Sequence, residues 1–598
     1  MPSQTIQMNK RIIFSLIFSS ALLFSFAQTK PIDKSFTQED WDKLSQQAKD
    51  SINKELTAKF EAAKKESANA DEANANQIID EALKNTTGTT SLTFTNFPKS
   101  QLRDDITKFK NLEQFTCTKC RALQLNILFS QLAQLPKLKK LNISGGAYKI
   151  LPGSIQKLSA LEELNLKDNN FTTLPDSFTT LKNLHILNLE HNPYLYDDDV
   201  FERIKNLSVT QLYFSASGLL ELNDKIGQIK SLVILDLSVN DIKTLPPSFS
   251  QLTGLQYLNL SQNFNLNIAQ VITALAPIRQ LNYLDISQCL IQSLPLDISK
   301  LTSLQILNLR ANQLTSLPLT FGSLTNLEEL DLSYLEMGTR MNKITELPPS
   351  FSSFKKLRHL NLAGNQLQNL PEGFSGLTQL EDLNLSLNKF TGFPPQLTQL
   401  TGLKSLNLGL NDGSSIPLAI GNLTQLEYLN LDGNFFNKLD RKIKTLPAEI
   451  CQLKNLKVLS LKDNVIEQLP PCIGSLSKLQ KLDLRDNLIT SFPASFTQLI
   501  NLNWLDLKAN DFTQLPADFQ NLTSLKELNL SMNLKMNFEA EKNKFSAMKQ
   551  LEFLDLSYNN ITKEQITPLR AALPNCKVIN WDYSKRTLPQ PTNRRNEK

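Results

Sequence analysis

Leucines recur along most of this chain at a spacing that neither a single helix nor a single strand explains. The frame Leu-x-x-Leu-x-Leu-x-x-Asn-x-Leu-x-x-Leu-Pro begins at Leu304 and returns at Leu357. In its Leu-x-Leu part the side chains alternate as in a β-strand, so both leucines point to one side. Proline is excluded from the interior of a central strand. The pattern therefore predicts a short strand followed by a return segment.

The same frame can be aligned 19 times along the chain, and twelve of the 18 intervals between successive starts are 23 residues. One such unit cannot bury its own leucines, whereas stacked units bury them jointly. The sequence therefore predicts one long solenoid. Its repeats start at residues 112, 138, 161, 184, 209, 232, 255, 281, 304, 327, 357, 380, 403, 426, 456, 479, 502, 525 and 551.

This pattern resembles the leucine-rich-repeat family, and its 23-residue units resemble the Ras-suppressor-like repeats. The resemblance implies an α/β solenoid, a curved horseshoe with parallel strands on the concave face and turns or short helices on the convex face. It also implies that a column of asparagines bonds the backbone of adjacent coils and is structural. That column contains Asn169, Asn192, Asn240, Asn263, Asn312, Asn365, Asn388, Asn411, Asn434, Asn464, Asn487, Asn510, Asn533 and Asn559.

The first 27 residues have the pattern of an export signal. Lys10 and Arg11 precede the apolar run 12–26, which ends in the small-x-small sequence before residue 28. This favours a secretory signal peptide cut after Ala27, with an uncleaved anchor as the alternative. We expect an exported protein of bacterial type, either periplasmic, on the cell surface or released, with no membrane span once the signal is removed.

Residues 28–90 are predicted to form a helical N-terminal segment. Apolar residues from Trp41 to Ala63 recur every three or four positions, which indicates an amphipathic helix. Residues 68–76 are rich in Ala and Asn and are interpreted as a break before a second short helix around Ile78–Leu83. The first helix either caps the repeat array or mediates oligomerisation through residues 36–65.

After the solenoid, which we place at residues 91–559, residues 560–583 are predicted to form a C-terminal cap. Residues 566–573 suggest a last helix, and residues 573–578 resemble the terminal strand of other solenoids. Residues 584–598 are polar and basic and are predicted to be a disordered tail.

The composition contains few residues that could support catalysis. The chain has three histidines, six scattered cysteines and a net charge of +5, which falls to +3 without Lys10 and Arg11. No phosphate-binding loop, zinc-protease motif or nucleophile elbow is present. We therefore expect no enzymatic activity, catalytic residue, metal, cofactor or nucleic-acid binding.

The cysteines are interpreted as structural. Cys120 and Cys289 fall in the asparagine column, so Cys117 and Cys120 are predicted to be core thiols, with a local disulfide as the alternative. Cys451 and Cys472 lie on adjacent coils but two positions out of register. We expect two unpaired thiols on the convex side there, with a disulfide again as the alternative.

The concave surface is the expected binding face. The position between the last two leucines of each strand is nearly always Asn or Asp, which is typical of a consensus surface. The position two residues earlier varies, and four successive coils place apolar side chains there. Exposed apolar and aromatic groups are typical of protein interfaces. The candidates are Ile234, Tyr257, Tyr283 and Ile306, with Tyr428 and Trp504 as isolated equivalents; mutual packing along the sheet is the alternative.

Two further surfaces are candidates. Lys462, Arg485 and Lys508 lie on consecutive coils and form either an anion-binding strip or a mixed surface neutralised by nearby aspartates. Two repeats are longer by seven residues, at about 335–341 and 435–441, and insertions often map to binding edges. Met337 and Phe435 are their candidate contacts.

We therefore expect a binding module that recognises a protein partner through the concave face and the edge loops. The alternatives are a glycan- or polysaccharide-binding protein and a self-associating surface adhesion protein.

Overall fold

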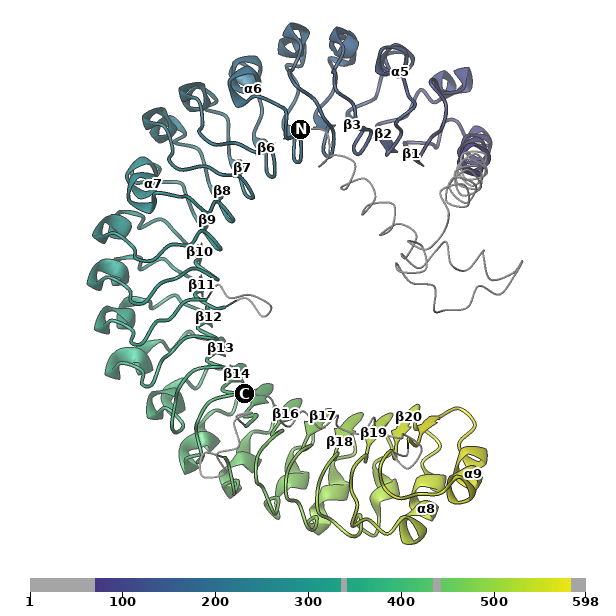
Figure 1. Cartoon of the computed structure of the whole chain (residues 1–598), viewed down its shortest axis with the longest axis vertical. Helices are drawn as coiled ribbons and strands as arrows, with labels where there is room; N and C mark the ends of the chain where they lie inside the picture. Colours follow the sequence, from purple (N-terminus) through teal and green to yellow (C-terminus); the bar gives the residue numbers. More distant parts are fainter. Residues whose placement is uncertain (1–69, 335–340, 434–441, 582–598) are drawn as a thin grey trace, which may run out of the picture.

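The computed structural model describes residues 70–334, 341–433 and 442–581. The chain winds into coils that stack along a curved, open arc, with strands on the inner face and helical turns on the outer face (Figure 1). The strands form one 21-stranded parallel sheet. The predicted fold class, a leucine-rich-repeat horseshoe, is confirmed.

The strands are short, and their pairing joins each coil to the next in sequence order. They are β1 (Ser91–Thr95), β2 (Gln114–Thr118), β3 (Lys140–Asn142), β4 (Glu163–Asn165), β5 (Ile186–Asn188), β6 (Gln211–Tyr213), β7 (Ile234–Asp236), β8 (Tyr257–Asn259), β9 (Tyr283–Asp285), β10 (Ile306–Asn308), β11 (Glu329–Asp331), β12 (His359–Asn361), β13 (Asp382–Asn384), β14 (Ser405–Asn407), β15 (Tyr428–Asn430), β16 (Val458–Ser460), β17 (Lys481–Asp483), β18 (Trp504–Asp506), β19 (Glu527–Asn529), β20 (Phe553–Asp555) and β21 (Lys577–Ile579).

The strands β2 to β20 each begin two residues after one of the repeat starts aligned in the sequence. The sheet extends one strand beyond the aligned repeats at each end. β1 was not recognised as a repeat, although Leu92 and Phe94 alternate in it and are buried. β21 overlaps the segment 573–578, which was expected to form a terminal strand, at residues 577 and 578 and extends to Ile579.

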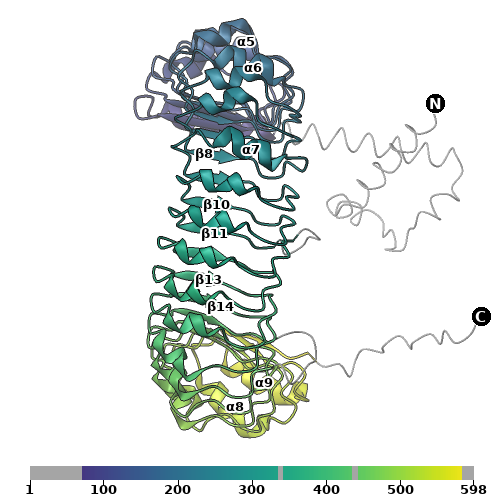
Figure 2. The same cartoon turned by 90° about the vertical axis from the view of Figure 1, so that its left-hand side faces the viewer.

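The convex side carries two kinds of helix, and the repeat length decides which one forms. Figure 2 shows helical turns following one another along this side. Intervals of 25 or 26 residues contain an α-helix, whereas the 23-residue intervals contain a 3₁₀ turn. The extra residues allow a longer helical segment to bury its apolar face. The α-helices of the repeat array are α5 (Leu125–Leu132), α6 (Asp197–Ile204), α7 (Ile268–Leu275), α8 (Phe538–Ala547) and α9 (Lys563–Ala572).

The 3₁₀ helices follow the Leu-Pro pairs in most coils, because proline fixes the backbone angle before the turn. They are η1 (Asp104–Lys108), η2 (Gly153–Leu158), η3 (Asp176–Thr180), η4 (Asp224–Gln228), η5 (Pro247–Gln251), η6 (Leu296–Lys300), η7 (Leu319–Ser323), η8 (Pro349–Ser353), η9 (Glu372–Gly376), η10 (Pro395–Gln399), η11 (Leu418–Asn422), η13 (Ala448–Gln452), η14 (Ile473–Ser475), η15 (Ala494–Gln498) and η16 (Phe519–Asn521).

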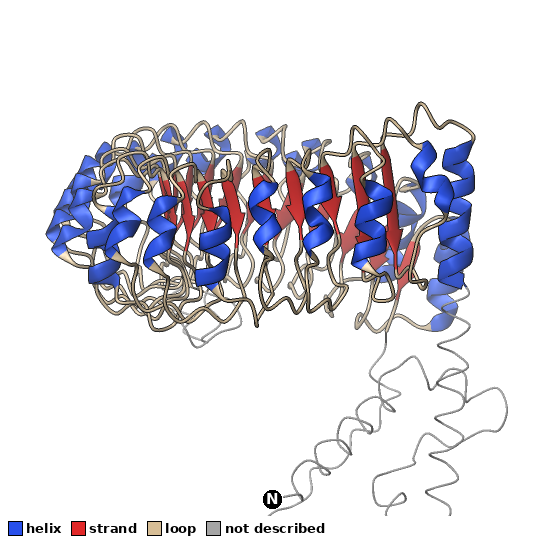
Figure 3. Ribbon diagram, turned by 90° about the horizontal axis from the view of Figure 1, so that it is seen from above, coloured by secondary structure: helices blue, strands red, loops and turns tan. Residues whose placement is uncertain are grey.

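The strands and the convex helices form two layers (Figure 3). The core is a continuous row of buried side chains between them, most of which are leucines. The asparagine column closes this row on one side. The Asn312 amide, which is fully buried, donates to the carbonyl oxygens of Ile286 and Leu309 at 2.9 and 3.0 Å. Its oxygen accepts from the backbone N–H groups of Cys289 and Ile291. Each such side chain therefore ties adjacent coils together.

The long repeat that starts at residue 327 keeps its place in this column. Asn342 donates to the carbonyl oxygens of Leu309 and Leu332 and accepts from the backbone of Leu314. The chain thus returns to the repeat frame after its extra residues. Asn434, the expected column member of the other long repeat, lies outside the described residues.

A helix at residues 70–83 precedes the first strand, and Ala75 and Ile79 on it are buried. The expected break at residues 68–76 is therefore wrong for the part that is described, residues 70–76. Alanine has the highest intrinsic helix propensity, and Ala75 and Ile79 are four residues apart, so they lie on one face of the helix. Residues 1–69 and 582–598, with the predicted signal, first helix and tail, lie outside the described residues.

Both cysteine pairs form disulfides, which corrects two interpretations of the sequence. Cys117 and Cys120 are bonded to each other in the core rather than being free thiols. Cys451 and Cys472 are also bonded, with Cα atoms 6.0 Å apart, a distance within the usual disulfide range. Cys451 lies in η13 and Cys472 directly precedes η14 on the next coil, so the two residues meet on the convex side although they are out of register. Cys289, which falls in the asparagine column, is a buried free thiol.

Candidate functional site

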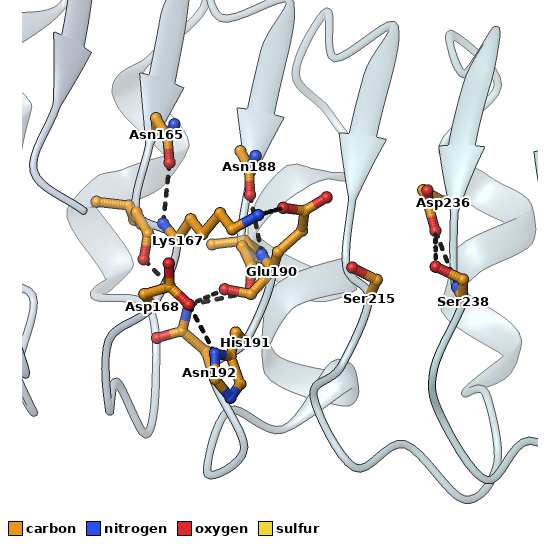
Figure 4. Close-up of polar contacts among 12 residues, drawn as sticks. Asn165, Lys167, Asp168, Asn188, Glu190, His191, Asn192, Ser215, Asp236 and Ser238 are labelled. Atoms are coloured by element: carbon orange, nitrogen blue, oxygen red, sulfur yellow. Dashed lines mark hydrogen bonds and ion pairs between the residues drawn. The ribbon is translucent and has the colours of Figure 1, made fainter. Parts of the chain in front are cut away.

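The central column of the concave face has a structural role. Asn165 and Asn188 accept a hydrogen bond from the backbone N–H two residues further on, at 3.0 Å each (Figure 4). Asp236 accepts in the same way from Ser238, through both its backbone and its hydroxyl. These side chains fix the end of each strand, which accounts for the uniformity of the column.

Four of the sequence candidates form one patch. Ile234, Tyr257, Tyr283 and Ile306 are the first residues of β7 to β10, and they pair directly across neighbouring strands. The rings of Tyr257 and Tyr283 are stacked, with centroids 4.1 Å apart and planes 12° from parallel. All four side chains keep part of their surface exposed. We call these four residues the tyrosine patch.

The tyrosine patch both packs along the sheet and remains accessible. The stacked rings restrict each other, so little side-chain entropy is left to lose when a ligand covers them. Burial between the coils raises the pKa of the Tyr257 and Tyr283 hydroxyls, so both stay protonated donors near neutral pH. Asp285, two residues after Tyr283, is buried, and desolvation raises the pKa of its carboxyl. It accepts from the Asn308 amide at 2.8 Å.

Tyr428 and Trp504 do not join the tyrosine patch. Tyr428 begins β15 between Ser405 and Val458 on the adjacent strands. Trp504 begins β18 between Lys481 and Glu527. Both are partly exposed and remain isolated candidates.

The basic candidates are engaged with carboxylates. Lys462 lies 3.3 Å from the Asp463 carboxylate. The Arg485 guanidinium lies 3.1 Å from Asp483 and 4.0 Å from Asp506. Burial raises the pKa of the Asp483 carboxyl to about 7, against the opposing effect of Arg485, and also raises the pKa of Asp506. With Lys508 on the next coil, the three bases lie in a mixed-charge network; anion binding there stays a prediction.

The structure does not describe the candidates in the two inserted segments. Met337 and Phe435 are outside the described residues. The chain is described up to Tyr334 and again from Met341, and up to Gly433 and again from Lys442. Both gaps follow a strand of the concave sheet, β11 and β15, in the equivalent place of the coil.

Two histidines bond aspartates across neighbouring coils. His191 Nδ1 lies 2.6 Å from Asp168, and His359 Nδ1 lies 2.6 Å from Asp382 (Figure 4 shows the first pair). Each is a single pair, and in the described ranges no group of three or more His, Cys, Asp or Glu side chains could hold a metal ion.

One polar hollow was missed in the sequence. It has a volume of about 630 Å³ and lies at the amino ends of β16 to β19. Lys457, Lys478 and Lys526 line it together with amide and hydroxyl side chains. We call it the lysine hollow. The sequence does contain a pattern that could have indicated this hollow. The residue immediately before each strand alternates in charge along several coils, and this position becomes neutral at Gln480 and Asn503.

Comparison with known families agrees with this architecture. Residues 136–193, 279–334 and 340–390 match the leucine-rich repeat model, and residues 438–580 match the leucine-rich repeat region model. The chain belongs to the leucine-rich-repeat family. None of the curated proteins matches the sequence.

Solved structures show the same solenoid. A chain of the Drosophila Toll–Spatzle complex is 19% identical, with a TM-score of 0.56, over 78% of this chain and 61% of that one. A TDR receptor is 24% identical, with a TM-score of 0.53, over 84% of this chain and 86% of its own. A leucine-rich-repeat protein of Leptospira interrogans is 25% identical, with a TM-score of 0.46, over 84% of this chain and 98% of its own. The first two likenesses establish the shared fold.

Proposed function

We propose that this protein is an exported, non-catalytic binding module whose concave face holds an extended segment of a protein partner against the tyrosine patch. The observation that carries the proposal is the stacked pair Tyr257 and Tyr283, flanked by Ile234 and Ile306 on the adjacent strands. Neighbouring strands lie about 4.8 Å apart, so the patch presents four apolar side chains in one row. A row of this kind suits a peptide running across the strands.

The surroundings support a peptide more than a purely apolar ligand. Asn259 donates to Asp236 at 3.0 Å, and Asn308 donates to Asp285 at 2.8 Å, directly beside the patch. These pairs hold polar groups in fixed positions around an apolar centre, which is the usual composition of a protein interface. Large aromatic groups in such a centre contribute most of the binding energy.

The proposed export rests on residues 1–27. In the rest of the chain, as far as the structure describes it, no helix is long and apolar enough to cross a membrane.

The test is a pull-down with the full chain from the cells and medium of the source organism. Three baits are compared: the wild type, a Tyr257→Ala/Tyr283→Ala variant, and a Tyr194→Ala/Tyr196→Ala variant. Tyr194 and Tyr196 are more exposed, at 61% and 71%, and lie outside the patch, so they control for the loss of two tyrosines.

The proposal predicts a protein captured by the wild type and by the Tyr194/Tyr196 variant but lost by the Tyr257/Tyr283 variant. Circular dichroism melting of all three baits shows whether the solenoid is intact. Equal capture by all three folded baits would contradict the assignment of the concave patch.

A further inference from the structure

The lysine hollow lies on a different part of the arc from the tyrosine patch. It is formed along the edge of coils β16 to β19, the green part of the chain in Figure 1, whereas the patch lies on β7 to β10. One row of its lining immediately precedes the strands: Lys457, Gln480, Asn503 and Lys526. A second row comes from the end of each preceding turn: Lys478, Asn501, Ser524 and Gln550.

The first row results from a break in a charge pattern. On the preceding coils this column alternates between acid and base: Arg358 and Lys404 both bond Glu381, and Lys457 bonds Glu427 at 2.6 Å. Glutamine and asparagine then occupy the next two coils. The alternation resumes with Lys526, which bonds Glu552 at 2.7 Å. The hollow is therefore a neutral gap between two lysines.

The acids that accompany these lysines are not part of the lining. Glu427 precedes β15 and Glu552 precedes β20, and neither lines the hollow. An ammonium group has three N–H donors. A bond to one carboxylate orients Lys457 and Lys526 and leaves further donors for a ligand.

Lys478 lies between them and has a neutral partner. Its ammonium donates to the side-chain oxygen of Asn455 at 2.8 Å, and its positive charge contributes, after that of Lys457 and Lys404, to lowering the pKa of Glu427. The electrostatic field of Lys478 thus reaches Glu427, the partner of Lys457 at one end of the hollow. The result is three positive groups around a lining that contains no carboxylate.

The remaining side chains of the lining favour a saccharide over a peptide as the ligand. It consists of primary amides and hydroxyls, with no aromatic or aliphatic residue among them. Amides donate and accept, as the hydroxyl groups of a sugar do. Peptides usually depend on apolar anchors in apolar subsites, and the hollow offers none. Its volume lies within the range of small-molecule sites, roughly 300–1,000 Å³.

We propose that the lysine hollow binds a short anionic oligosaccharide, with its carboxylate or sulfate groups on Lys457, Lys478 and Lys526 and its hydroxyls on the amides between them. This site is independent of the tyrosine patch. A protein with both sites can hold a protein partner and an acidic glycan at the same time.

Isothermal titration calorimetry of the full chain tests the site with three probes of equal length. The probes are an oligogalacturonate hexamer, a heparin-derived hexasaccharide and the neutral cellohexaose. The first carries carboxylates only, the second also sulfates, and the third carries no charge. A polyglutamate peptide of six residues tests whether acidity alone suffices.

The chain offers a matched control for the lysine substitutions. Lys356 occupies the equivalent position of another coil and donates to the Asn326 side-chain oxygen at 2.7 Å, as Lys478 does to Asn455. Lys356→Gln and Lys478→Gln therefore remove the same charge and the same kind of contact. Only Lys478 lines the hollow.

We expect one of the two acidic saccharides to bind at a single site, with at least tenfold weaker binding in Lys478→Gln and unchanged binding in Lys356→Gln. We expect cellohexaose not to bind, and the Tyr257→Ala/Tyr283→Ala variant to bind like the wild type. Failure of both acidic saccharides to bind would overturn the proposal. So would equal weakening by the two lysine variants, or tighter binding of polyglutamate than of either saccharide.

Discussion

Asp483 is a buried carboxylate beside a second one. It lies in β17 next to Asp506 of β18, and the two residues are 7% and 3% exposed. Burial raises the pKa of Asp483 from 3.8 to about 7, and Arg485 opposes this only in part. Asn occupies the same position in β13, β14 and β19. Asp483→Asn therefore removes the charge and keeps an oxygen that can accept from the backbone of Arg485.

The sign of the effect follows from proton binding. Because the pKa of Asp483 is higher in the folded protein, the folded state binds a proton at this carboxyl more tightly than the unfolded state does. The stability contributed by the protonated carboxyl is therefore fully present below pH 3.8 and is lost as the pH rises through 7. The difference between 3.8 and about 7 corresponds to a free energy of about 4 kcal/mol at pH 8. The opposing effect of Arg485 is already contained in this raised pKa. We therefore expect Asp483→Asn to raise the free energy of unfolding at pH 8, by at most about 4 kcal/mol.

Urea unfolding at pH 8 and pH 4, followed by tryptophan fluorescence, measures this change. Trp504 lies on the strand next to Asp483 and reports on these coils. Asp555→Asn, at the equivalent position of β20, controls for any general preference for Asn. The variant is expected to have a higher midpoint than the wild type at pH 8 and to lose this advantage at pH 4. A lower midpoint at pH 8, or an advantage that does not depend on pH, would refute the reasoning.

Two further predictions concern the solenoid. Asn312→Ala removes four hydrogen bonds, three of which join neighbouring coils, and should lower the free energy of unfolding by about 3 kcal/mol or more; in urea unfolding, an effect no larger than that of the half-buried control Asn326→Ala would be evidence against the ladder. The Cys451–Cys472 disulfide closes a loop of 21 residues, which corresponds to at most about 3 kcal/mol of unfolded-state entropy. Dithiothreitol should therefore lower the melting temperature of the wild type more than that of Cys451→Ala/Cys472→Ala. Equal shifts of the two melting temperatures would count against a stabilising role of this disulfide.

The repeat frame was visible in the sequence because it depends on local spacing. Leu307 and Leu309 alternate as a strand requires, and Pro318 marks the turn that follows. The same spacing explains why Tyr257 and Tyr283 could be expected to be neighbours. The interval of 26 residues between them contains the helix α7, and only the structure links the longer interval to an α-helix.

The features that the sequence did not predict depend on contacts between residues that occupy different positions of the repeat on neighbouring coils. Cys451 and Cys472 differ by two positions in the repeat frame, and the fixed frame does not show that they meet. The lysine hollow requires residues from two rows of neighbouring coils. Asn342 returns to the asparagine column only after the extra residues of its repeat, which a fixed frame does not anticipate.

The most direct test of the proposed function is site-specific photo-crosslinking in the source organism. A benzophenone amino acid is placed either at Tyr283, in the patch, or at Leu418, which begins the convex helix η11 and is 67% exposed. The account predicts one discrete crosslinked protein from position 283 and none of that mass from position 418. Crosslinks to the same protein from position 418 alone would contradict recognition by the concave face.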